Sequence, residues 1–278
     1  MIKLLITDLD DTLYSWIGFF VPAFYDMVDE ISKITSINSE VLLAEYKQVH
    51  QYCGSSEYPY ATLLLPCLKS KYESEKVLRE ILDPAFHRFN STRKKYLELY
   101  PTVFDTLKLL HEKGIKIIGY TESTIENGLY RLKKLGIDDF FDKMYVSKSN
   151  YSQDIPQEIS SKITIVSSKK PDSKVLCQIC QDANVLNQEA IYVGDSLTKD
   201  IYMAKKAGII SVLCKFQKLS SDLYSRLVEI SHWTKSDFEL EANLKKEMID
   251  LNIEADFIIN SYSELIPIIM EHDKISPH

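Results

Sequence analysis

The sequence lacks the features that would mark a membrane or nucleic-acid-binding protein. No apolar run approaches the roughly 18 residues that a bilayer-spanning helix needs. The stretch before Asp8 carries a single lysine and is too short for a secretory signal peptide. The 40 acidic residues outnumber the 33 basic ones, giving a net charge of -7. Because nonspecific nucleic-acid binding requires a basic face, we expect neither a nucleic-acid nor a membrane partner.

Cysteine is also scarce: five residues are scattered along the chain, an odd number. Cys177 and Cys180 have the spacing of a zinc or redox pair. They lie, however, within an apolar pattern of helical period, and no second pair is near. We therefore interpret them as core cysteines. Reduced thiols are typical of a cytoplasmic protein, and that is the location the sequence predicts.

The 278 residues can form one large domain or a core with a smaller one. Residues 2–7 form an apolar run that predicts a buried strand. Helical spacing follows from about residue 14 to residue 100, and strands and helices alternate thereafter. Further strands are predicted at 115–120, 141–146, 190–193, 209–213 and 256–259. The polar stretch 147–168 predicts a loop, and residues 123–126 (Ser-Thr-Ile-Glu) predict a capping box.

Such alternation predicts an α/β fold, a doubly wound parallel sheet covered by helices on both faces. The all-helical stretch predicts an inserted domain. We therefore expect a discontinuous core at 1–14 and 99–278 and a helical cap domain at 15–98. Residues 217–252 exceed what a connection needs, so they predict a helical insertion within the core.

Polar side chains follow several of the predicted strands, where ligands of parallel sheets bind. Asp8 and Asp10 lie two residues apart and so on one side of an extended chain. Their charges repel unless a cation or proton lies between them, and Mg²⁺ takes such oxygen ligands. At the same edge, Thr121 and Asp195 come after the predicted strands 115–120 and 190–193, and Lys170 comes just before a predicted helix. This inventory suits phosphoryl transfer through a carboxylate nucleophile, an acid/base partner and anion-binding donors.

Four motifs in order make the chain resemble the haloacid dehalogenase superfamily of phosphatases with a helical cap of the C1 class. They are residues 6–12 (Ile-Thr-Asp-Leu-Asp-Asp-Thr), 118–121 (Ile-Gly-Tyr-Thr), 170–171 (Lys-Pro) and 194–200, which begin Gly-Asp-Ser and end in Asp. The motifs and the neighbouring residues that also match the family cover about two-thirds of the chain. Such a cap closes over the substrate and excludes water.

The resemblance implies a role for each matching residue. Asp8 is the expected nucleophile and a metal ligand, and Asp10 is the expected general acid/base, with its backbone carbonyl on Mg²⁺. The expected phosphate-binding residues are Thr121, Glu122 and Lys170. Asp195 is the remaining expected metal ligand, with Asp200 supporting the metal or anchoring the lysine. Asp11 has no expected role.

Some of these roles have alternatives. Thr121 and Asp200 can instead be helix caps, and Lys169 or Lys148 can take the place of Lys170. In the break at 54–60 and just before it, the tyrosines Tyr52, Tyr58 and Tyr60 are candidate contacts for the leaving group, or belong to a plain interhelical loop.

The predicted function is Mg²⁺-dependent hydrolysis of a small phosphomonoester through an aspartyl-phosphate on Asp8. Asp10 argues against a dehalogenase, which needs no leaving-group acid at that position. A phosphomutase of the same superfamily keeps both aspartates and stays an alternative, as does a non-catalytic binding or signalling protein. A receiver domain is much shorter and lacks a helical insert. We expect a monomer or a homodimer.

Overall fold

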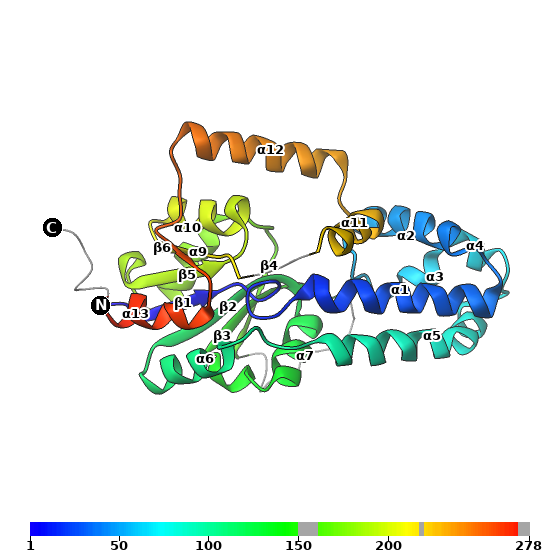
Figure 1. Ribbon diagram of the computed structural model, residues 1–278, viewed down its shortest axis with the longest axis horizontal. Helices are drawn as coiled ribbons and strands as arrows, with labels where there is room; N and C mark the ends of the chain where they lie inside the picture. The colour runs from blue at the N-terminus through cyan, green and yellow to red at the C-terminus, as the bar shows by residue number, and fades with distance from the viewer. Residues whose placement is uncertain (150–160, 217–219, 272–278) are drawn as a thin grey trace. The chain divides into compact units, whose positions relative to one another are not determined.

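The computed structural model of the chain describes residues 1–149, 161–216 and 220–271. The chain divides into two compact units (Figure 1). The core unit comprises Met1–Ser15, Glu98–Gln217 and Glu241–His278. The helical unit comprises Trp16–Leu97 and Lys218–Leu240. Within the described ranges, none of the helices combines the length and the apolar character needed to cross a membrane.

The core unit is built on a sheet of seven parallel strands in the order β4-β3-β2-β1-β5-β6-β7. The strands are β1 (Leu4–Thr7), β2 (Lys116–Thr124), β3 (Lys143–Ser147), β4 (Ile163–Val166), β5 (Ala190–Gly194), β6 (Ile210–Cys214) and β7 (Phe257–Ile259). The central strands β1 and β5 are buried along their whole length, which explains their continuous apolar runs. The predicted doubly wound α/β fold is confirmed.

Helices cover both faces of this sheet (Figure 1). They are α6 (Val103–Glu112), α7 (Ile125–Leu135), α9 (Ser173–Asp182), α10 (Tyr202–Ala207) and α13 (Leu265–Met270). Helix α12 (Lys235–Asp250) contributes Met248, which packs with Ile201 and with Leu213 of β6. Apolar side chains of α9 and α10, among them Leu176 and Met203, form one buried cluster with Ile6 and Tyr120 of the sheet. In Figure 1, α6 and α7 lie on the opposite side of the sheet from α9 and α10, as expected where strand order reverses about β1.

The predicted loop at 147–168 is wrong in part, because β4 lies within it. This strand is at the edge of the sheet and only half-buried, and the side chain of Ile165 is 46% exposed. Its four residues, Ile-Thr-Ile-Val, have the apolar, β-branched character of a strand. The run is short and lies within a stretch that is otherwise polar, and the whole stretch was therefore predicted as a loop. Residues 150–160 of the predicted loop lie outside the described residues.

The helical unit contains α1 (Trp16–Thr35), α2 (Ser39–Cys53), α3 (Ala61–Leu64), α4 (Pro66–Lys69), α5 (Glu75–Tyr96) and α11 (Ser221–Ile230). Helices α1 and α5 pack along each other. Phe20 and Phe24 of α1 point into an aromatic cluster with Phe89 and Tyr46.

Helix α11 belongs to the helical unit, whereas the predicted boundaries placed all of 217–252 in the core. The hydroxyl of Tyr25 donates to the carbonyl of Arg226 at 3.1 Å, and the ammonium of Lys47 donates to that of Val228 at 2.7 Å. The Nδ1 atom of buried His50 lies 2.6 Å from the carbonyl oxygen of Ile230. These contacts join segments 180 to 201 residues apart, and local sequence patterns do not reveal such partners.

The register of the central strands brings the predicted site residues to one edge of the sheet. Thr7 pairs with Gly119 of β2 and with Val193 of β5. The residues that follow β1, the end of β2 and the residues that follow β5 therefore meet at the carboxyl edge, where ligands of such sheets bind.

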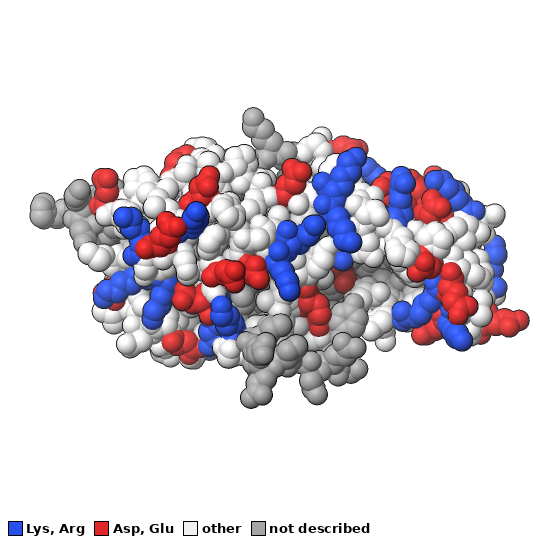
Figure 2. All heavy atoms as spheres, turned by 90° about the horizontal axis from the view of Figure 1, so that it is seen from below, with Lys and Arg blue, Asp and Glu red and all other residues white. Residues whose placement is uncertain are grey.

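On the face drawn in Figure 2, the basic side chains (blue) and the acidic side chains (red) are interspersed over the surface.

Candidate active site

Asp8 and Lys170 form a buried ion pair at the carboxyl edge of the sheet. The Lys170 ammonium lies 2.5 Å from Asp8 Oδ1, and the two side chains are 3% and 9% exposed. Thr12 donates its hydroxyl to Asp8 Oδ2 at 3.2 Å, so both carboxylate oxygens of Asp8 have a donor. The backbone N–H of Asp8 donates to the carbonyl of Val193, extending the β1–β5 pairing as far as this residue.

Asp200 anchors the same lysine from the other side. Its Oδ1 lies 2.9 Å from Lys170 Nζ and accepts the hydroxyl of Tyr192 at 2.7 Å. The N–H of Ser196 donates to Asp200 Oδ2 at 3.0 Å. This last bond fits the alternative role of Asp200 as a helix cap. The Asp200 carboxylate nevertheless also contacts Lys170 in the site.

The glycine of the fourth motif makes this approach of Asp200 possible. A Cβ atom at Gly194 would lie 2.4 Å from the carboxyl carbon of Asp200, well inside contact distance. Glycine allows a side chain to approach the backbone this closely. The motif therefore uses Gly194 to make room for the carboxylate that holds Lys170.

Lys170 is the lysine that reaches the aspartates, whereas Lys169 and Lys148 have exposed side chains. Burial lowers the pKa of the Lys170 ammonium, but the charges of Asp200 and Asp8 together raise it well above its ordinary value. The lysine is therefore a fixed positive charge beside Asp8.

Three carboxylates gather around this lysine. Asp8, Asp195 and Asp200 each offer an oxygen atom, and these atoms lie within 4.8 Å of one another. Burial, followed by the charges of Asp200 and other acids, raises the pKa of Asp195 well above its usual range. Burial likewise raises the pKa of Asp8, and Lys170 offsets only part of that effect. A donor set of hard carboxylate oxygens that repel one another suits a divalent cation such as Mg²⁺.

Asp10 faces a different set of partners from those of Asp8. Its Oδ2 accepts the hydroxyl of Ser123 at 2.7 Å and that of Thr121 at 3.1 Å. Its Oδ1 lies 2.7 Å from the guanidinium of Arg131. Burial and the charge of Asp10 raise the pKa of the nearby Tyr14 phenol. The Asp10 side chain thus lies in a polar network supplied by β2 and α7.

Thr121 and Ser123 lie where the register of the β2–β3 pairing shifts, between Tyr120 and Thr124. Irregularities of this kind re-aim side chains, and they are common next to active sites. The strand continues through Thr124, and α7 begins at Ile125 with no side chain capping it. The predicted capping box is therefore wrong, because the Ser123 hydroxyl binds Asp10 instead of the helix terminus.

The carboxylate of Glu122 contacts one backbone N–H and one ammonium group. One oxygen accepts the backbone N–H of Lys170 at 3.2 Å, and the other lies 2.5 Å from the ammonium of Lys199. A carboxylate repels a phosphate group, so this side chain suits support of the lysine segment better than the predicted contact with substrate. Its backbone N–H stays a candidate phosphate donor.

The candidate tyrosines of the helical unit differ in their surroundings. Tyr52 is 90% exposed. The rings of Tyr58 and Tyr60 lie edge to face with their centroids 5.8 Å apart, and the guanidinium of Arg79 lies 5.4 Å from the Tyr60 ring centre. Their contact with a leaving group stays a prediction.

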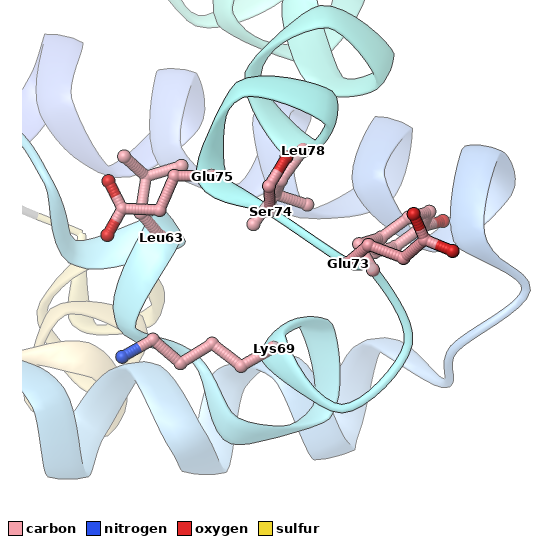
Figure 3. Close-up of a pocket in the computed structure, with 7 residues that line it drawn as sticks. Leu63, Lys69, Glu73, Ser74, Glu75 and Leu78 are labelled. Atoms are coloured by element: carbon pink, nitrogen blue, oxygen red, sulfur yellow. The ribbon is translucent and has the colours of Figure 1, made fainter.

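A pocket of about 200 Å³ lies between α3, α4 and the start of α5 (Figure 3). Leu63 and Leu78 contribute buried apolar surface, while Lys69, Glu73 and Glu75 are exposed. In Figure 3, these charged side chains lie around an open space. None of the predicted catalytic residues lines it, and the charges at its rim are of both signs.

The sequence analysis gave no role in the site to several residues that contact the predicted ones: Thr12, Ser123, Arg131 and Tyr192. Tyr192 gave a signal, because a tyrosine in the middle of a buried strand needs a partner for its hydroxyl. Arg131 gave none beyond its place in α7, since two other basic residues of that helix, Lys133 and Lys134, are exposed.

Comparisons with known proteins bear on the family and the fold of the chain. The family model of the haloacid dehalogenase-like hydrolases matches residues 2–208. A glyceraldehyde 3-phosphate phosphatase from Methanopyrus kandleri is 29% identical over 76% of this chain and 83% of its own length. A protein of the same name from Pyrococcus abyssi is 27% identical over 78% and 83%. A crystal structure of a 2-haloacid dehalogenase from Pseudomonas syringae has a TM-score of 0.61 and 21% identity, covering 98% of this chain and 99% of its own, which shows a shared fold.

The chain belongs to the haloacid dehalogenase-like hydrolase family. It is an enzyme of the phosphatase branch, a phosphoric monoester hydrolase, and this prediction from the four motifs is confirmed.

Proposed function

We propose that the chain is a Mg²⁺-dependent phosphatase that hydrolyses a small phosphomonoester through an aspartyl-phosphate on Asp8. The observation that carries the proposal is the ion pair of Asp8 with Lys170. The carboxylates of Asp195 and Asp200 lie close to this pair, with oxygen atoms of the three aspartates within 4.8 Å of one another. A nucleophilic carboxylate next to a buried ammonium and a cation site suits attack on a negatively charged phosphoryl group.

Asp8 and Asp195 are the proposed side-chain ligands of the metal, with the backbone carbonyl of Asp10 and support from Asp200. When bound there, Mg²⁺ would supply positive charge to the phosphoryl oxygens. The ammonium of Lys170 adds a second positive charge, which Asp200 and Tyr192 hold in place.

In the first proposed step a carboxylate oxygen of Asp8 forms a bond to phosphorus, and the bond from phosphorus to the leaving oxygen breaks. Asp10 donates a proton to that oxygen, so the alcohol leaves neutral. In the second step Asp10 takes a proton from water, whose oxygen attacks phosphorus. The bond between phosphorus and Asp8 then breaks, and phosphate leaves. The N–H groups at the start of α7 are the proposed donors to the phosphoryl oxygens, together with the hydroxyl of Thr121 when it turns from Asp10 to the substrate.

The proposed substrates are phosphate esters of small metabolites. The support is the similarity to two glyceraldehyde 3-phosphate phosphatases over more than three-quarters of the chain. Glyceraldehyde 3-phosphate is therefore the first compound to test, together with phosphoglycolate, sugar phosphates and nucleotides.

Turnover of 4-nitrophenyl phosphate with Mg²⁺ and after chelation tests the proposal. We expect activity that depends on Mg²⁺ and falls at least 10³-fold in Asp8→Asn, since the nucleophile is lost. The matched control is Asp11→Asn, which removes a neighbouring carboxylate without an assigned role and should retain activity within about threefold. Turnover without a divalent cation, or an active Asp8→Asn variant, would contradict the proposal.

A further inference from the structure

The guanidinium of Arg131 is almost completely buried, with only 3% of the side chain exposed. It donates from one nitrogen to Asp10 Oδ1 and to Ser123 Oγ, both at 2.7 Å. A buried arginine costs several kcal/mol unless its charge is paired and its N–H groups have acceptors. The carboxylate of Asp10 provides that pairing here.

The contacts around Asp10 restrict its carboxylate at both oxygens. Arg131 donates to Oδ1, while the hydroxyls of Thr121 and Ser123 donate to Oδ2. Ser123 also accepts from Arg131, so the guanidinium fixes one of the hydroxyls that fixes the carboxylate. The backbone N–H of Ser123 donates in turn to the hydroxyl of Thr121 at 3.0 Å. The result is a connected network in which a rotation of the carboxylate breaks more than one bond.

All of these donors come from one stretch of chain. Thr121 and Ser123 lie at the end of β2, and Arg131 lies on α7, which follows without a connecting loop. The same stretch carries the second motif at the carboxyl edge of the sheet. The geometry that presents Thr121 to the site therefore also fixes the orientation of Asp10.

We propose that Arg131 is a positioning residue that, with Ser123, holds the Asp10 carboxylate in the orientation from which it transfers protons. This inference rests on the proposed function, in which Asp10 protonates the leaving oxygen. Arg131 acts through Asp10, whose Oδ1 accepts a hydrogen bond from the guanidinium. Its buried charge is thereby explained by catalysis rather than by stability, since buried pairs are on average poor sources of stability.

The proposal predicts a dependence on the leaving group. Hydrolysis of an alkyl phosphate requires a proton on the leaving oxygen, whereas 4-nitrophenolate leaves without one. For Arg131→Met we expect kcat/KM for glycerol phosphate to fall by about 10–100-fold, in line with a misplaced acid group. For 4-nitrophenyl phosphate the expected fall in kcat/KM is less than about threefold. Arg131→Lys keeps the charge and should recover part of the loss.

Asp10→Asn and Lys134→Met complete the experiment. Asp10→Asn reports the full leaving-group effect, and Lys134→Met alters an exposed basic residue of the same helix and should behave like wild type with both substrates. Circular dichroism shows whether Arg131→Met folds. If it does not fold, Ser123→Ala takes its place, because it removes the hydroxyl that bridges Arg131 and Asp10. In that variant kcat/KM should again fall more for glycerol phosphate than for 4-nitrophenyl phosphate, by a smaller factor than in Arg131→Met.

The outcomes separate the two proposals. A leaving-group effect in Asp10→Asn but equal losses on both substrates in the Arg131 and Ser123 variants would overturn the role of Arg131. No leaving-group effect in Asp10→Asn would overturn the role of Asp10 itself, and with it the proposed function. A split in both sets supports the positioning role.

Discussion

Removal of the Lys170 ammonium is expected to destabilise the protein as well as abolish its activity. In Lys170→Met the carboxylates of Asp8 and Asp200 lose a cation at 2.5 and 2.9 Å, in a place where the lysine side chain is 3% exposed. Removing one partner of a buried ion pair typically costs 3–5 kcal/mol, because the other charge stays buried and unpaired. Here two carboxylates lose their partner, so we expect at least about 3 kcal/mol.

Urea or thermal unfolding measures this cost, and Lys169→Met is the matched control. Lys169 is the adjacent residue with an exposed side chain, and surface substitutions usually change stability by less than about 0.5 kcal/mol. The loss in Lys170→Met corresponds to roughly 6 °C or more in the midpoint of thermal unfolding. Adding Mg²⁺ should recover part of it, because a divalent cation supplies positive charge to the same carboxylates. Equal stability of the two variants would refute the assignment of Lys170 as the buried cation.

Two further predictions concern the packing at Asp200 and the pH dependence of the helical unit. Gly194→Ala places a Cβ 2.4 Å from the Asp200 carboxyl carbon, so we expect a loss of about 1–3 kcal/mol and a fall in kcat of at least tenfold. Gly128→Ala, where the nearest side-chain atom lies at 3.8 Å, should be tolerated, and equal effects of the two would contradict the argument. Burial lowers the pKa of His50 to about 4, so the unfolded chain binds more protons between pH 6.5 and 4 and stability falls as the pH drops through that window. In unfolding experiments at pH 7.5 and 4.5 this contributes about 2–3 kcal/mol, which His50→Asn should remove, and an unchanged pH dependence in that variant would rule out His50 as its source.

The fold and the centre of the site were largely predictable because local patterns encode them. Central strands such as β1 and β5 are apolar throughout, and the motif residues lie directly after them, where a parallel sheet places its ligands. Asp8, Lys170 and Asp200 were named from the sequence, and the structure brings them within hydrogen-bonding distance. Sequence order could not decide between Lys170 and its neighbour Lys169, because that choice depends on which side chain turns inward.

The features that were missed depend on contacts between distant segments. Helix α11 joins the helical unit through bonds such as that from Lys47 to Val228, and no pattern within either helix identifies the other as its partner. Arg131 is likewise one basic residue among several on α7, and only the tertiary structure brings it to Asp10. Strand β4 was missed for a different reason: its apolar run of four residues, Ile-Thr-Ile-Val, is short and lies within an otherwise polar stretch.

Trapping the covalent intermediate on Asp8 tests the central claim most directly. Borohydride added during turnover with Mg²⁺ reduces an acyl phosphate to the alcohol, so the side chain of Asp8 becomes that of homoserine. The proposed mechanism predicts this conversion in the peptide that contains Asp8, detected by mass spectrometry, and predicts none without substrate or in Asp8→Asn. Mg²⁺-dependent turnover in which Asp8 stays unmodified, or modification of a different carboxylate, would contradict the proposed mechanism.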